Sequence, residues 1–177
     1  MNAYPSRRPT GGMIDRDRVI PFQFNGRHYK GYPGDTLASA LLANGVRVVA
    51  RSFKYHRPRG IVAAGFEEPN ALVQLQGTSE EPNVLATCLP LTDHLHAKSQ
   101  NCWPGPRFDL GSVNDLISRL IPAGFYYKTF MWRPWNSYAR VIRKAAGLGQ
   151  IPKTTESEFY EKRYHHCDIL IVGAGPS

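Results

Sequence analysis

The residues best suited to binding a cofactor lie at the end of the chain, in the stretch CDILIVGAGPS at 167–177. An apolar run over 169–172 predicts a buried strand, and Gly173, Ala174 and Gly175 follow it directly. A strand that leads into Gly-x-Gly opens many dinucleotide-binding folds, because the glycines allow a tight turn and close approach of a pyrophosphate. We predict an NAD or FAD site that begins here. No third glycine, helix or ribose-binding acid follows, so we expect the whole site in a longer parent chain.

A second stretch, RPRGIVAAGFEEPNALV at 57–73, has the outline of a loop that cradles a metal cluster or a phosphate. A glycine and a small run lead to a turn, and a strand-like apolar run follows. The stretch holds no cysteine or histidine that would ligate a metal. Its acidic pair, Glu67 and Glu68, begins the turn before Pro69, and we expect both charges to be exposed.

The other candidate ligands are dispersed. The three cysteines, Cys88, Cys102 and Cys167, lie far apart without a CxxC pair, which favours reduced thiols over a disulfide framework or a zinc site. His94 and His96 would share one face of a strand, yet no third ligand lies at a telling spacing. We therefore assign no catalytic residue and no metal site.

Two stretches combine basic and aromatic residues. ARSFKYHRPRG at 50–60 has the composition of a surface for nucleic acid or phosphate, but no recognised nucleic-acid module surrounds it, so a solvated or packed loop is the favoured interpretation. FYYKTFMWRPW at 125–135 is typical of a flavin or substrate channel, or of core or interface packing. Lys128 and Arg133 are the charges to test there.

Local signals predict the elements around these stretches. Alternating Ile20, Phe22 and Phe24 precede an Asn-Gly turn, which indicates an antiparallel hairpin. A helix follows over 36–45, capped by Asp35 or Thr36, ended by Gly45 and buried through an apolar stripe. That stripe comprises Leu37, Ala38, Leu41 and Leu42.

Further strands and two helices complete the prediction. The strands lie over 71–77 and 83–91, and Cys88 would be a small buried residue on the second of them. Ser112 and Asp115 form a predicted capping box for a short helix that carries Leu116, Ile117 and Leu120. Another helix begins near residue 137 and ends at residue 147.

The predicted elements are a hairpin, a helix, a loop and further strands. This order predicts an α+β fold of the β-grasp type. We divide the chain into a flexible basic arm (1–18), a ferredoxin-like β-grasp domain (19–98), a helical, aromatic-rich connecting region (99–166) and the incomplete start of a dinucleotide-binding domain (167–177).

Composition narrows the class of protein. Of the 177 residues, 42% are hydrophobic and 20% charged, which is typical of a globular protein rather than a disordered one. The formal charge of +8 favours anionic cofactors, nucleic acid or an acidic partner subunit. We find no apolar run long enough to span a bilayer and no secretory signal, so we expect a cytoplasmic protein without membrane contact.

Four stretches carry a resemblance to a known family. They are FKYHRPRGIVAAGFEEPNALVQL, SQNCWPGPRFDLGSVNDLISRLIPAGFYYKTFMW, IRKAAGLG and YEKRYHHCDILIVGAGP. The sequence resembles the N-terminal part of the α subunits of heterotetrameric sarcosine oxidases, whose relatives include opine and octopine oxidases and hydrogen cyanide synthase.

The resemblance implies a segment of a flavoenzyme complex that oxidatively demethylates sarcosine to glycine. The resemblance also implies several cofactors, namely FAD on a β subunit, FMN near the α–β interface, and NAD and tetrahydrofolate on the α subunit. It implies γ and δ subunits as further partners. On this interpretation the segment has a structural and assembly role. A ferredoxin-like electron-transfer module and a basic nucleic-acid-binding module are the alternatives.

The resemblance also implies an origin for the loop at 57–73. Cluster-bearing relatives carry a C-x4-C-x2-C run there, whose three positions fall on Ala63, Glu68 and Ala71, with the fourth ligand near Cys88. A 2Fe-2S cluster needs four ligands, usually thiolates, and alanine supplies none. We therefore expect no iron–sulfur cluster.

Overall fold

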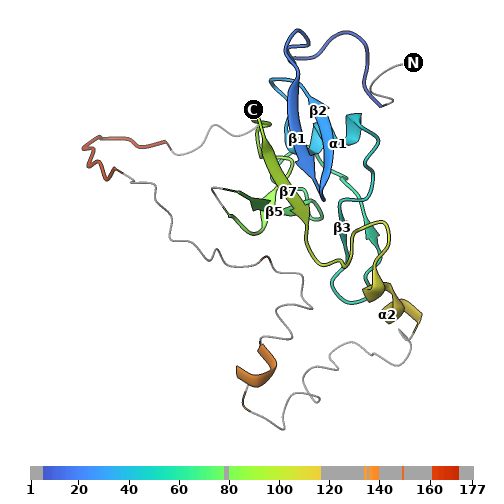
Figure 1. Ribbon diagram of the computed structural model, residues 1–177. Coiled ribbons are helices and arrows are strands. Elements are labelled where there is room, and N and C mark those ends of the chain that lie inside the picture. The colour runs from blue at the N-terminus through green and yellow to red at the C-terminus, as the bar shows by residue number, and fades with distance from the viewer. Residues whose placement is uncertain are drawn as a thin grey trace.

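A five-stranded mixed sheet with a short helix packed against it forms the centre of the molecule (Figure 1). The computed structural model describes residues 6–77, 80–116 and 161–171, together with 134, 136–139 and 149. The strands of the sheet are β1 (Ile20–Phe24), β2 (Arg27–Gly31), β5 (Leu72–Gln76), β6 (Val84–Leu85) and β7 (Leu95–Ser99). They lie in the order β2-β1-β7-β5-β6.

The two strands that are farthest apart along the chain, β1 and β7, pair in parallel at the middle of the sheet, with Phe22 opposite Leu95. The β1–β2, β5–β7 and β5–β6 pairs are antiparallel. This arrangement confirms the prediction of an α+β, ferredoxin-like fold.

The predicted hairpin is present as β1 and β2. Asn25 and Gly26 both have positive φ angles, 51° and 74°, which the two central residues of a tight hairpin turn require. Ile20, Phe22 and Phe24 point into the core, while the residues between them face outward.

The predicted helix is α1 (Leu37–Ala43). Thr36, rather than Asp35, is its N-cap: the Thr36 hydroxyl accepts from the Ser39 N–H, and the Ser39 hydroxyl accepts from the Thr36 N–H. Gly45, with φ of 76°, follows its end. The buried stripe differs from the prediction, because Leu42 is exposed and the core side is formed by Leu37, Ala38, Ala40, Leu41 and Ala43.

The strand predicted over 83–91 is wrong for most of its length. Only β6, two residues long, is a strand, and the chain then turns, with the Cys88 N–H donating to the Leu85 carbonyl. Cys88 therefore lies in a turn and is half-buried, whereas a buried residue on a strand was predicted. His94 has φ of 58° and precedes β7, so it does not share a strand face with His96, contrary to prediction.

Two pairs of short elements flank the sheet. β3 (Ala50–Arg51) and β4 (Pro58–Arg59) pair antiparallel and enclose the basic segment. Farther along, a 3₁₀ turn, η1 (Leu110–Ser112), runs into α2 (Val113–Leu116). Asp109 caps this pair of turns, so the predicted capping box at Ser112 is wrong: the Ser112 hydroxyl donates to the Asp109 carbonyl.

Part of the predicted arm lies against the domain. Arg7 forms an ion pair with Asp35, whose side chain is 1% exposed, and the Arg7 guanidinium also lies over the Tyr32 ring. Asp15 donates its N–H to a carbonyl in the turn before α1, and Arg18 pairs with Asp93.

Several predictions fall on residues outside the described part of the chain. These are Ile117, Leu120, Lys128, Arg133, Gly173, Ala174 and Gly175. Residues 136–139 form a helical turn at the start of the predicted 137–147 helix. The buried strand predicted over 169–172 is wrong for its described residues, because 169–171 are exposed and are not in a strand. Among the described residues, no helix is long and apolar enough to cross a bilayer.

Candidate functional site: the loop at 57–73

A buried carboxylate lies at the centre of this loop. Glu68 is 2% exposed, and its Oε2 accepts from the N–H groups of Val62 and Ala63, each at 2.7 Å. Its Oε1 accepts from the N–H of Asn70 at 2.8 Å. The prediction that both glutamates are exposed is therefore wrong for Glu68 and holds only for Glu67.

The electrostatics of Glu68 follow from these contacts. Burial by itself raises the pKa of this carboxyl, but hydrogen bonds from the N–H groups of Ala63, Asn70, Val62 and Ala71 outweigh burial and lower the pKa below its usual value. Glu68 is consequently ionised at neutral pH. Its negative charge is balanced by backbone dipoles that converge from both sides of one loop.

Hydrogen bonds also connect the loop to the turn that follows β6. The Gly65 carbonyl accepts from the Glu68 N–H at 3.2 Å and from the Thr87 hydroxyl at 2.8 Å. The Ala86 N–H donates to the Ala71 carbonyl. These bonds place the turn that contains Cys88 beside the loop, as a fourth cluster ligand would require.

The residues at the four ligand positions that the resemblance implies do not fit an iron–sulfur cluster. Ala63 and Ala71 end in methyl groups, and the Glu68 carboxylate already accepts backbone hydrogen bonds. Only Cys88 offers a thiol, and four ligands are needed. No group of three or more potential ligands among the described His, Cys, Asp and Glu residues is arranged to hold a metal ion.

A second buried carboxylate, Asp109, was not predicted. Its Oδ2 lies 2.6 Å from Nδ1 of His56, and its Oδ1 accepts from the N–H groups of Trp103 and Gly111. Burial would raise the pKa of Asp109, but the bonds from Trp103, His56 and Gly111 lower it. Gly111 has no room for a side chain, because a Cβ there would meet the His56 ring at 2.3 Å.

Most described cations of the basic segment bind the protein itself. The Arg51 guanidinium donates to the carbonyls of Pro106, His56 and Arg107. Arg57 lies over the Tyr55 ring and pairs with Asp115 on α2. These contacts favour the packed-loop interpretation of the segment over the nucleic-acid interpretation.

Cys102 lies beside Asp109 and is a poor nucleophile. Burial and the negative charge of Asp109 raise the pKa of its thiol to about 11, although Arg51 and Ser99 act in the opposite direction. The thiol is therefore protonated at neutral pH, and the reactive form of a cysteine is the thiolate.

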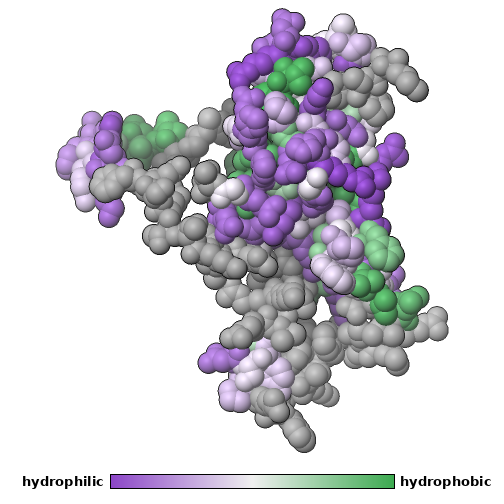
Figure 2. Space-filling view, in the orientation of Figure 1, coloured by the Kyte–Doolittle hydropathy of each residue, from purple (hydrophilic) through white to green (hydrophobic). Residues whose placement is uncertain are grey.

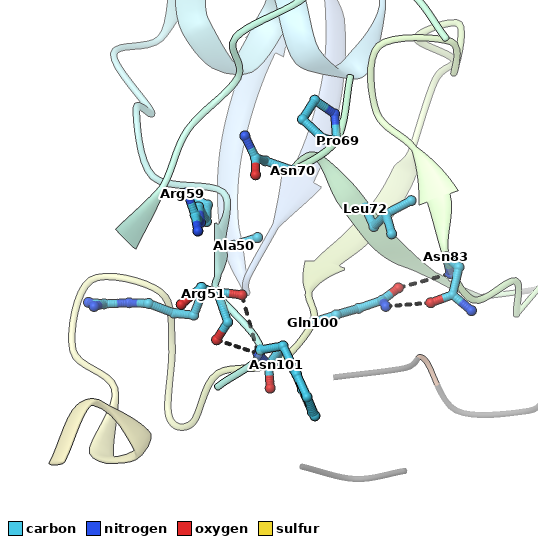
Figure 3. Close-up of a pocket in the computed structure, with 11 residues that line it drawn as sticks. Ala50, Arg51, Arg59, Pro69, Asn70, Leu72, Asn83, Gln100 and Asn101 are labelled. Atoms are coloured by element: carbon cyan, nitrogen blue, oxygen red, sulfur yellow. Dashed lines mark hydrogen bonds between the residues drawn. The ribbon is translucent and has the colours of Figure 1, made fainter. Parts of the chain in front are cut away.

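A cavity of about 290 Å³ lies between the loop and β3 (Figure 3). Arg51 and Arg59 are among its lining residues. So are Asn101, which donates to the Arg51 and Ser52 carbonyls, and the hydrogen-bonded pair Gln100 and Asn83. Ligand pockets run from roughly 300 to 1,000 Å³, so this cavity is at the lower limit and is small for a flavin or dinucleotide.

Comparison with known proteins identifies the relatives of this chain. It is 52% identical over its whole length to the sarcosine oxidase subunit alpha of Rhizobium meliloti (strain 1021). It is 30% identical, over 98% of its length, to the subunit of the same name from Corynebacterium sp. (strain P-1). The chain is a relative of the sarcosine oxidase α subunits. This confirms the resemblance, and the chain spans 18% and 14% of the lengths of these two relatives.

The comparison with domain families agrees with the observed fold. Residues 17–102 match the family of 2Fe-2S iron-sulfur cluster binding domains. The match includes the loop that lacks cluster ligands. Among solved structures, L-proline dehydrogenase from P. horikoshii aligns over 51% of this chain and 17% of its own, with a TM-score of 0.40 and 21% identity.

Proposed function

We propose that the chain forms the N-terminal segment of the α subunit of a sarcosine oxidase and has a structural, rather than electron-transferring, role in that complex. The observation that carries the structural role is the Glu68 carboxylate, which lies in the loop of a cluster-binding domain and accepts the loop's own N–H groups. The similarity to sarcosine oxidase α subunits supports the parent complex.

The proposed parent is an oxidoreductase that acts on the CH–NH group of its donor. Such a complex converts sarcosine, dioxygen and water into glycine, formaldehyde and hydrogen peroxide. FAD, FMN and tetrahydrofolate, together with the β, γ and δ subunits, belong to this proposal. So does an NAD or FAD site that begins at Gly173, Ala174 and Gly175, supported by the strand-like run before them.

An apolar surface supports the assembly role. Phe108, Leu110, Val113 and Leu116 are 49–84% exposed around η1 and α2. Figure 2 shows apolar residues gathered at this end of the molecule, next to the largely polar face of the sheet domain. Contiguous apolar surface that a protein leaves exposed commonly marks a site of contact with another protein or domain.

The experiment that tests the structural role measures iron, acid-labile sulfide and visible absorption in purified chain. We expect none of the three at stoichiometric levels, even after anaerobic reconstitution with ferrous iron and sulfide. The matched control is the variant A63C/E68C/A71C, which restores three thiols beside Cys88 and should gain the cluster's visible absorption on reconstitution. A cluster in the unmodified chain would overturn the proposal.

The parent assignment has a separate test. Co-expression with a sarcosine oxidase β subunit should yield a co-purifying complex, provided that the chain is extended by the rest of an α subunit. The variant L110S/L116S should weaken this association, whereas the control M13S, at a fully exposed position far along the chain from α2, should not. Equal association of both variants would count against an assembly role for this surface.

A further inference from the structure

We infer that the loop over 62–71 is an anion-binding cradle that this chain fills with its own side chain, the Glu68 carboxylate. When the carboxylate is removed, the cradle becomes a binding site for a small carboxylate anion such as acetate. This inference goes beyond the proposed function, because it concerns the chemistry of the loop and holds whichever amine the parent complex oxidises.

The geometry of the donors is that of an anion site. Val62 and Ala63 donate successive N–H groups to one carboxylate oxygen, and Asn70 donates to the other from the far side of the loop. Consecutive N–H groups that converge on one point form a concave site for negative charge. The interactions that lower the pKa of Glu68 in the described structure are all with backbone N–H groups, including that of Ala71.

The occupant stands at an informative position. In the alignment that the family resemblance implies, Glu68 takes the place of the second cysteine of the C-x4-C-x2-C run, and two of its donors, Ala63 and Ala71, take the places of the first and third. A cluster and its thiolates are also anionic, and hydrogen bonds to the sulfurs stabilise them. One carboxylate can therefore satisfy N–H groups that would otherwise face the cluster.

Burial makes the occupant necessary. Glu68 is 2% exposed and Ala71 is fully buried, so the carboxylate and the Ala71 N–H are withdrawn from solvent, whereas Val62 is 72% exposed. A buried donor that loses its acceptor costs free energy that no new contact restores. The loop is thus built around a negative charge.

Truncation of Glu68 to alanine offers a matched probe. Glu68→Ala deletes a methylene and a carboxylate, which are the heavy atoms of acetate. Acetate can accept the same hydrogen bonds, and acetamide, of the same size but neutral, can place only one oxygen toward them.

The test compares thermal unfolding of the wild-type chain, E68A and E68Q in rising concentrations of acetate, at constant pH and ionic strength. We expect E68A to melt about 10 °C below the wild type, since several charge-assisted bonds are lost from a small domain. Acetate should then raise the melting temperature of E68A progressively, as a ligand of the folded state does. Acetamide should not, and the wild type and E68Q should show only the small general effect of the salt.

A direct readout distinguishes binding from general stabilisation. In E68A, titration with acetate should shift the amide proton resonances of Val62, Ala63 and Asn70, and leave those in α1 unchanged. Equal acetate responses of wild type and E68A, or wild-type stability of E68A, would overturn the inference. If E68A is unfolded in buffer, acetate should restore its near-ultraviolet circular dichroism, and no recovery at any concentration would also overturn it.

The inference and the proposed function can fail separately. Iron and sulfide in the unmodified chain would contradict the clusterless role, whereas the acetate titration depends only on the cradle. If the chain binds no cluster and E68A does not respond to acetate, the proposed structural role still holds, but the inference of an anion-binding cradle is wrong.

Discussion

Glu68 and Asp109 are both buried acids whose pKa values are lowered, but different partners lower them. Glu68 is held by backbone N–H groups from within its own loop. Asp109 accepts two backbone bonds from its own segment and also pairs with His56, which is 53 residues away. The first carboxylate gives one loop its shape, and the second joins two distant segments.

This difference predicts how each site responds to change. Backbone donors cannot titrate and cannot move independently of the chain, so the Glu68 site can respond to loss of the carboxylate only by movement of the loop or by entry of water. The Asp109 site contains an imidazole whose Nδ1 can act as donor or acceptor, depending on the tautomer, and so adapt. We expect Glu68 to be the more sensitive of the two positions.

The largest effect is expected for Glu68→Gln. The amide keeps the size of the side chain but turns one acceptor into a donor that faces N–H groups, so it should lower the free energy of unfolding by about 2–3 kcal/mol. Urea denaturation of the purified chain measures this loss. Glu67→Gln, at the exposed neighbouring position, is the matched control and should change stability by less than about 0.5 kcal/mol.

The direction of the Glu68 pKa shift predicts how the stability of the protein changes in acid. Its folded pKa lies below the ordinary value of 4.5, so its ionised form stabilises the fold above that pH, and the contribution disappears as the pH falls through the folded pKa. The free energies of unfolding of wild type and E68Q should therefore differ by a constant amount near neutral pH and become equal in acid. A difference that grows in acid would contradict the assigned pKa shift.

A smaller loss is expected for Asp109→Asn. Its remaining oxygen still accepts from Trp103 and Gly111, and its amide can donate to Nδ1 of His56 when that nitrogen is the acceptor, so about 1–2 kcal/mol should be lost. The measurement is again urea denaturation. If D109N proves more destabilising than E68Q, the proposed contrast between rigid and adaptable donors is wrong.

The smallest effect concerns the thiol beside Asp109. The negative charge of Asp109 helps to raise the pKa of Cys102 to about 11, so D109N should lower that pKa and accelerate alkylation of Cys102 by iodoacetamide at pH 8 several-fold. Peptide mass mapping over time gives the rate. Cys167, which is exposed, is the internal control and should react at the same rate in both proteins.

Local elements were predictable because their signals are local. The Asn25-Gly26 turn and the Thr36 cap each act within a few residues, and both are found where the sequence places them. Leu42 shows the limit of this reasoning, because its exposure depends on where the sheet lies relative to α1.

The site was harder to predict, for a physical reason. An acidic pair before proline is typical of an exposed turn, and burial of Glu68 depends on N–H groups contributed by Val62 and Ala63 after the loop has closed. The His56–Asp109 pair joins segments whose sequences contain no mutual signal. In the sequence, only the implied alignment of Glu68 with a cluster ligand indicated that this residue lies at the centre of the loop.

The parallel pair of β1 and β7 has a consequence for synthesis of the protein on the ribosome. β7 separates β1 from β5, and Asn25 bonds to Ser99 across a separation of 74 residues. Until β7 has left the exit tunnel, the β1–β2 hairpin with α1 and the β5–β6 hairpin are two halves with open edges. Because such edges can pair with other chains, nascent chains that stop short of Leu95 are the species that we expect to need a chaperone.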